Sequence, residues 1–189
     1  MSGQVGRSPG IAIFGLGFAV ALAGDATHVA SGTTVYDWDG VPTLWRSALW
    51  FPFAVAFAVL AAAWSAERFG PPPVRRRGPA DVALGAGLVL ALYALTAVVH
   101  DQPPTVSVVL TGAIAVAIWA WWDPSPRALG VALGAAVLGP LGEVLVVEAG
   151  AAHYAASADG LLGVGEWLPC LYFAAGAVAS GLWTAVRAP

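Results

Sequence analysis

The sequence predicts an all-α, polytopic membrane protein in which about six transmembrane helices form one bundle. Hydrophobic residues make up 59% of the 189 residues and charged residues only 10%, and the mean hydropathy is +0.77. This balance lies far outside that of water-soluble domains. Long apolar runs recur along the chain, and none alternates with the two-residue period of a barrel strand. Because lipid offers no partner for free backbone groups, each run must be a helix.

Each apolar run is long enough to cross the hydrocarbon core, which takes roughly 20 helical residues. The predicted spans cover residues 10–30, 44–66, 80–100, 105–122, 127–150 and 166–187. The connecting segments are short and rich in glycine, proline and other helix breakers. We therefore expect residues 1–189 to form a single transmembrane domain.

Arginines predict the orientation, because short cytoplasmic loops retain basic residues. A model with a cytoplasmic N-terminus leaves only Arg46 on the outer side. The cytoplasmic segments then hold Arg7, Arg68, Arg75, Arg76, Arg77, Arg127 and Arg187. We expect a multi-pass protein with both termini in the cytoplasm. Arginine as the sole basic residue, with many alanines and glycines, suggests a bacterial origin and hence the inner membrane; the formal charge of -3 gives no surface for nucleic acid.

Glu143 is the sharpest anomaly within a predicted span, because an ionisable group there costs several kcal/mol unless it meets protein, water or a partner. It lies near Pro140 in a run rich in glycine. We expect it to face a cavity, with helix packing and a proton relay as alternatives. Glu148, nearer the end of the span, is expected to be interfacial.

Prolines and small residues predict the shape of the bundle. Pro52, Pro140 and Pro169 are expected to bend their helices and leave space for a lipid-sized pocket. Two pairs of small residues at four-residue spacing are expected to bring helices together. They are Gly130 with Gly134, and Gly176 with Ser180.

The histidines His28, His100 and His153 are predicted at the outer ends of spans, with Asp25 three residues before His28. We interpret them as interfacial polar ends, and keep as an alternative a membrane enzyme that holds a metal with these histidines. The sequence otherwise predicts no metal, no cofactor and no catalysis.

The fourth span ends in three tryptophans, and the following turn begins at Asp123. Trp119, Trp121 and Trp122 are expected to anchor the helix at headgroup level. The Asp123 carboxylate is expected to cap the next helix, and the alternative is that this turn docks a partner.

Several segments resemble the insulin-induced gene (Insig) family of six-span membrane proteins. Residues 167–176, WLPCLYFAAG, resemble the family's WLPC-aromatic-AGG segment nearly residue for residue. Residues 47–52, SALWFP, are similar to its S-A-W-W-V-P stretch in the second span. Further matches in register are Gly70, Pro72, Asp123, Ser125, Gly130, Gly134, Gly150 and Tyr154. The resemblance covers about three-quarters of the chain.

The resemblance implies a lipid-binding cavity between the helices rather than catalysis. Animal members bind oxysterols and retain sterol-sensing-domain proteins in the endoplasmic reticulum, and Asp123 matches an aspartate involved in regulating those clients. The ligand here is expected to be a sterol-like, isoprenoid or diacylglycerol-like lipid of the bilayer, and a homo-oligomer is left open. The expected lining residues are Phe53, Trp119, Pro140, Glu143, Val144 and Phe173. The alternative is a small proton-coupled transporter in which Glu143 titrates.

Overall fold

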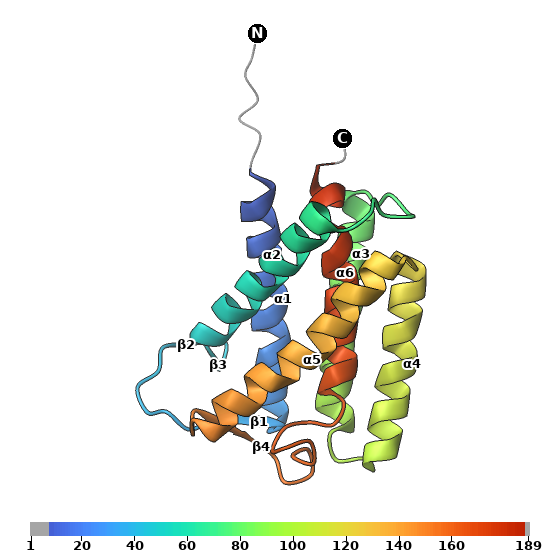
Figure 1. Ribbon diagram of the computed structural model, residues 1–189. Coiled ribbons are helices and arrows are strands. Elements are labelled where there is room, and N and C mark those ends of the chain that lie inside the picture. The colour runs from blue at the N-terminus through green and yellow to red at the C-terminus, as the bar shows by residue number, and fades with distance from the viewer. Residues whose placement is uncertain (1–7, 188–189) are drawn as a thin grey trace.

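The computed structural model describes residues 8–187, so Arg7 lies outside the described residues. Within this range, 6 helices are long and apolar enough to cross a membrane, which confirms the predicted bundle (Figure 1). The helices are α1 (Pro9–Ser31), α2 (Trp50–Phe69), α3 (Pro79–Val99), α4 (Pro104–Trp122), α5 (Pro126–Glu148) and α6 (Leu168–Val186).

Helix α6 forms the centre of the bundle. It contacts every other helix, and 56% of its membrane-spanning window is buried, against 17% for α5. Gly176 explains the close approach of α5, because a Cβ there would lie 2.6 Å from the Ala135 Cβ. Gly130 and Gly134 were also expected to bring helices together. That expectation was wrong, because a Cβ at either position would meet no atom of a neighbouring described segment within 4 Å.

Short antiparallel strands tie loops together at the end of the bundle where α1 ends (Figure 1). Strand β1 (Thr34–Tyr36) pairs with β4 (Ala152–Tyr154), and β2 (Thr43–Leu44) pairs with β3 (Ser47–Ala48). We call this the hairpin end (residues 32–49 and 149–167). The opposite end, where α2 leads into α3 and α4 into α5, is the arginine end (residues 70–78 and 123–125).

The second helix begins six residues later than predicted. Residues 44–49 were expected to be helical, but β2 and β3 form a tight hairpin whose turn holds Trp45 and Arg46 at φ 51° and 73°. This left-handed backbone is incompatible with a helix, so α2 begins only at Trp50.

Proline bends fewer helices than expected. Pro52 and Pro169 both lie in the first turn of their helices, where the backbone nitrogen has no partner to lose. Only Pro140 lies inside a helix of the described chain, in α5 close to Glu143. The expectation of three kinked spans was therefore wrong for two of the three prolines.

Candidate functional site

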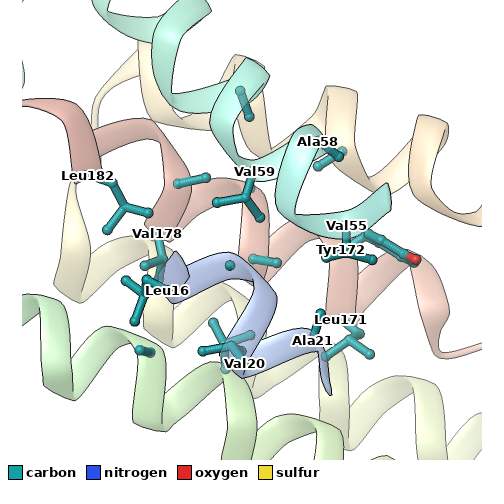
Figure 2. A pocket seen from close by; sticks show the side chains of 18 of the residues that line it. Leu16, Val20, Ala21, Val55, Ala58, Val59, Leu171, Tyr172, Val178 and Leu182 are labelled. Carbon is teal, nitrogen blue, oxygen red and sulfur yellow. The ribbon is translucent and has the colours of Figure 1, made fainter. Parts of the chain in front are cut away.

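An apolar cavity lies between α1, α2 and α6, with contributions from α3 and α5 (Figure 2). It encloses about 100 Å³, or about 780 Å³ with its open side included. Leu16 and Val20 line it from α1, Val55 and Val59 from α2, and Leu182 from α6. We refer to it as the apolar cavity. Its lining suits hydrocarbon and offers little to a charged ligand.

Two tyrosines form the polar boundary of the apolar cavity. Tyr172 lines it from α6, and its hydroxyl donates a 2.7 Å hydrogen bond to Glu143 Oε1. Tyr93 lines it from α3 and also lines a second, smaller cavity towards the hairpin end. The Tyr172 hydroxyl and the Tyr93 side chain therefore lie where hydrocarbon-like lining changes to polar lining.

Glycines on the facing helices make room for both tyrosine rings. A Cβ at Gly139 of α5 would lie 2.2 Å from Tyr172 Cγ, and one at Gly24 of α1 would lie 2.5 Å from Tyr93 Cγ. No side chain fits at such distances without displacing the ring. Gly24 and Gly139 thus allow the two tyrosine rings to pack directly against the facing helices.

The second cavity, which we call the carboxylate cavity, measures about 10 Å³ and brings together Asp25 of α1 and Glu143 of α5. The two side chains are only 3% and 8% exposed. The Tyr36 hydroxyl donates a 2.8 Å hydrogen bond to Asp25 Oδ2. Burial, and then the Asp25 carboxylate, raise the pKa of Tyr36 well above its ordinary value, so this hydroxyl keeps its proton and remains a donor.

His28 also lines the carboxylate cavity, but a hydrogen bond fixes its ring. Thr96 donates its hydroxyl proton to the Tyr93 carbonyl at 2.8 Å, so it accepts from His28 Nε2, also at 2.8 Å. The ring lies 5.0 Å from that of Trp167, centroid to centroid. The interpretation of Asp25 and His28 as interfacial polar ends was therefore wrong, because both are buried.

The other two histidines have partners of their own: half-buried His100 directly follows α3, and exposed His153 lies in strand β4. His100 is hydrogen-bonded to Ser157 at 3.3 Å, and His153 contacts Asp37 at 2.8 Å. Within residues 8–187, no group of three or more histidine, cysteine, aspartate or glutamate side chains is arranged to hold a metal ion. The three histidines therefore do not converge on one site.

The residues expected to contact a lipid are dispersed. Glu143 and Pro140 are buried, and Glu143 lines the carboxylate cavity instead of the apolar one. Val144 and Phe173 are half-buried against the core, Trp119 is half-buried, and Phe53 is 46% exposed on α2. None of the six lines the apolar cavity. Their role in lipid binding remains a prediction.

Sequence reasoning missed the tyrosines, because Tyr36, Tyr93 and Tyr172 are far apart in the chain and each looks like an ordinary aromatic residue. One signal was present: Asp25 and His28 lie three residues apart, on one face of an otherwise apolar helix. Such a pair indicates a shared buried environment as readily as a membrane boundary.

At the arginine end, the Asp123 carboxylate is 1% exposed and holds three segments together. It accepts hydrogen bonds from the Val74 amide at 3.2 Å and the Ser125 hydroxyl at 2.9 Å, and it lies 3.8 Å from Arg127 Nη2. Asp123 was expected to cap α5, but this was wrong. The cap is Ser125, whose Oγ accepts a hydrogen bond from the Ala128 amide. A docking role for Asp123 stays a prediction, and would act through the shape of this turn.

Arginines of the loop between α2 and α3 bind the free carbonyl groups at the end of α4. Arg75 donates to the Trp121 carbonyl at 2.8 Å, and Arg77 Nε donates to the Trp122 carbonyl at 2.9 Å. Arg77 also stacks on the Trp121 ring, 4.5 Å from its centroid. Trp122 itself is fully buried in the core, so its expected role as a headgroup anchor was wrong.

Sequence comparison finds relatives of this chain among known proteins. No protein-family model matches the chain. An Insig protein homolog of Mycolicibacterium vanbaalenii is 39% identical over 175 residues, which cover 92% of this chain and 84% of the relative. Insulin-induced gene 2 protein of Gallus gallus is 27% identical over 88% of this chain and 75% of its own length.

Solved structures agree with these relatives. The crystal structure of MvINS, a mycobacterial Insig homolog, superposes with a TM-score of 0.91 at 34% identity and covers 98% of both chains. A cross-linked trimer of MvINS superposes equally well. Sequence identity of 39% over 92% of this chain is high enough to infer common descent with the Insig homolog of Mycolicibacterium vanbaalenii. The chain is therefore a member of the Insig family of multi-pass membrane proteins.

Proposed function

We propose that this protein binds one neutral, hydroxyl-bearing lipid in the apolar cavity and does so without catalysis. The observation that carries the proposal is the contact of Tyr172 with both environments: its ring lines the apolar cavity and its hydroxyl bonds to Glu143. A lipid tail entering sideways from the bilayer fills the apolar part, and its hydroxyl meets this polar boundary. A buried hydroxyl without a partner would be costly, so the boundary selects the headgroup.

Charge supports a neutral headgroup over a phosphate. Asp25 and Glu143 lie just beyond the tyrosines, and within residues 8–187 no arginine forms an ion pair with either carboxylate. A phosphate at this boundary would meet negative groups without a cation to offset them. Sterol-like, isoprenoid and diacylglycerol-like alcohols all have the required headgroup.

The test compares neutral lipid alcohols with their phosphorylated forms. Purified protein is incubated with diacylglycerol or phosphatidic acid, and with an isoprenol or its phosphate, and bound lipid is counted by native mass spectrometry. We expect at least tenfold preference for each alcohol. Glu143→Leu should reduce that preference more than it reduces folding, whereas Glu148→Leu, an exposed change on the same helix, should not. Lost expression with unchanged preference in the surviving protein would assign Glu143 to helix packing alone.

Membrane orientation and assembly belong to the same proposal. The arginine end holds Arg75 and Arg77, and Arg127 follows it in the first turn of α5, which supports a cytoplasmic location for this end and for both termini. Labelling single cysteines at Arg76 and Asp39 in intact cells tests it: only the cysteine at position 39 should react from outside. The trimer described for MvINS supports a homo-oligomer here, which cross-linking in membranes tests.

Proton-coupled transport is the second candidate, because two buried carboxylates lie in one cavity without an ion pair to an arginine in the described chain. Uptake into vesicles that requires a proton gradient, and that Glu143→Gln abolishes, would favour it. Lipid binding that is independent of such a gradient favours the first proposal.

A further inference from the structure

The turn between β2 and β3 holds two bulky residues in a backbone conformation that glycine and asparagine normally occupy. Trp45 has φ 51° and Arg46 has φ 73°, and Leu162 is the only other residue besides glycine with a positive φ within residues 8–187. The turn of Leu162 has Gly163 at its second position, whereas the Trp45–Arg46 turn has no glycine. Two-residue hairpin turns favour asparagine followed by glycine, so the tryptophan and arginine are retained at a cost in folding. Such a cost points to a function of these two side chains.

The tip of this hairpin projects from the bundle, although its base is fixed to it. Trp45 is 67% exposed, Leu44 before it is 42% exposed, and Arg46 is exposed as well. The following strand is the opposite, because Ser47 and Ala48 are fully buried and β3 contacts α1 and α2. The hairpin therefore presents an apolar side chain and a cation outward from a fixed base.

The hairpin lies within the depth of the bilayer. Helix α1 has 23 residues, close to the roughly 20 that cross the hydrocarbon core, so its ends mark the two membrane surfaces. In Figure 1, β2 and β3 lie between the levels of these two ends, whereas β1 and β4 lie at the level where α1 ends. The hairpin also pairs its own backbone, as lipid requires: β2 bonds to β3, and the Leu49 amide donates to the Pro42 carbonyl at 2.9 Å. An exposed side chain at this depth faces lipid.

Arg46 is the only arginine of the hairpin end, and no ion pair within the described part of the chain includes it. Acidic residues share this end with it, namely Asp37, Asp39, Asp159 and Glu166. Asp37 pairs with His153 instead, at 2.8 Å. A guanidinium group matches the oxygen atoms of a phosphate, and an indole ring is favourable at headgroup level. The Trp45–Arg46 pair thus suits a phospholipid.

We propose that the tip of the β2–β3 hairpin binds a phospholipid of the leaflet at the hairpin end. Trp45 packs among the acyl chains next to the headgroup, and Arg46 binds the phosphate. These contacts offset the strain of the left-handed turn. The site is separate from the apolar cavity, whose lining includes no residue of this hairpin, and it takes a phosphate-bearing lipid instead of a neutral one.

The first experiment measures the depth of the tip in vesicles of phosphatidylethanolamine and phosphatidylglycerol. A fluorophore is attached to Trp45→Cys or to Asp39→Cys in the full chain carrying Cys170→Ala. A nitroxide on the acyl chains should quench position 45 severalfold more than position 39, and iodide on both sides of the membrane should do the reverse. Quenching of position 45 by iodide but not by the nitroxide would place the tip in water, within reach of a soluble partner, and would overturn the proposal.

The second experiment exchanges the turn residues, and it decides even if a labelled variant does not fold. Trp45→Asn combined with Arg46→Gly gives the pair that such a turn favours, and Leu162→Asn gives the same pair in the other turn. Both variants should raise the unfolding midpoint in maltoside detergent without phospholipid, because strain is relieved. In phosphatidylglycerol nanodiscs, Leu162→Asn should keep its gain, whereas the double variant should lose it or unfold below wild type. Equal gains of both variants in nanodiscs, or a loss of stability by the double variant in detergent, would overturn the proposal.

The role of the phosphate is tested by Arg46→Gln, which keeps Trp45. Phosphatidylglycerol titrated into maltoside micelles should raise the midpoint of the wild-type protein saturably. Arg46→Gln should reduce that rise, whereas Arg68→Gln, an exposed change at the opposite end, should reduce it less. An unaltered rise in Arg46→Gln would contradict phosphate binding by this residue.

Discussion

The arginine end and the hairpin end both bury carboxylates, but they compensate them differently. At the arginine end, Asp123 has two hydrogen-bond donors and Arg127 beside it, all from the chain itself. Near the hairpin end, Asp25 and Glu143 accept hydrogen bonds from hydroxyl groups, including those of Tyr36 and Tyr172, and neither forms an ion pair with an arginine of the described residues. The contrast shows that the chain pairs a buried carboxylate with an arginine at the arginine end, whereas near the hairpin end it supplies hydroxyl donors without an arginine.

The largest expected effect follows from breaking the arginine end. Asp123→Ala removes the acceptor for Val74 and Ser125 and leaves Arg127 buried without its carboxylate. Breaking such a buried pair costs about 3–5 kcal/mol, so the free energy of unfolding should fall by that amount or the protein should fail to accumulate. Denaturant unfolding in detergent measures it. Glu148→Ala, at an exposed position, should change little, and an equally small effect at both positions would contradict a structural role for Asp123.

A smaller effect is expected where Tyr172 rests against α5. Gly139→Ala would place a methyl group 2.2 Å from Tyr172 Cγ, so the ring must move and its bond to Glu143 weaken. We expect a loss of about 1–3 kcal/mol together with a weaker preference for lipid alcohols. Gly142→Ala is the matched control, since its Cβ meets no described atom within 4 Å. Equal lipid selectivity in the two variants would mean that Tyr172 does not select the lipid headgroup.

The smallest effect concerns the hydrogen bond that fixes His28. Thr96→Val keeps the side-chain volume but leaves His28 Nε2 without its partner, which should cost about 1 kcal/mol. Thr184→Val removes a hydroxyl that bonds to Glu67 in an exposed setting and should stay within about 0.5 kcal/mol. Comparable losses at both sites would mean that burial does not strengthen the His28 contact.

Hydropathy and breaker residues predicted the bundle well, because apolar length and the need for internal backbone pairing leave few alternatives. They failed for residues 44–49, where a left-handed turn at Trp45 and Arg46 is invisible in apolar content. The prediction that proline bends each of these helices was wrong for Pro52, because a proline in the first turn does not bend a helix. The predicted start of α2 was too early, which placed Pro52 inside the helix.

The candidate site was only partly predictable. Glu143 was identified from the cost of an ionisable group in a span, and it is buried as that argument requires. Its neighbours were not identified, because tertiary packing, which no local spacing encodes, brings Tyr172 to bond with it and places Asp25 and Tyr36 in the same cavity. Phe53 shows another limit of the sequence: an aromatic residue in a span can face either the bundle or the lipid, and its identity does not predict which.

Lipid occupancy of the apolar cavity is the central claim, and native mass spectrometry on two matched variants tests it directly. Ala58 lines the cavity and Ala54 does not, although both are exposed positions one helical turn apart on α2. Wild-type protein and Ala54→Phe should each retain one lipid per chain through purification, whereas Ala58→Phe should lose most of it while remaining folded. Equal lipid retention in all three proteins, or only loosely held bulk lipid in the wild type, would contradict a specific lipid site in this cavity.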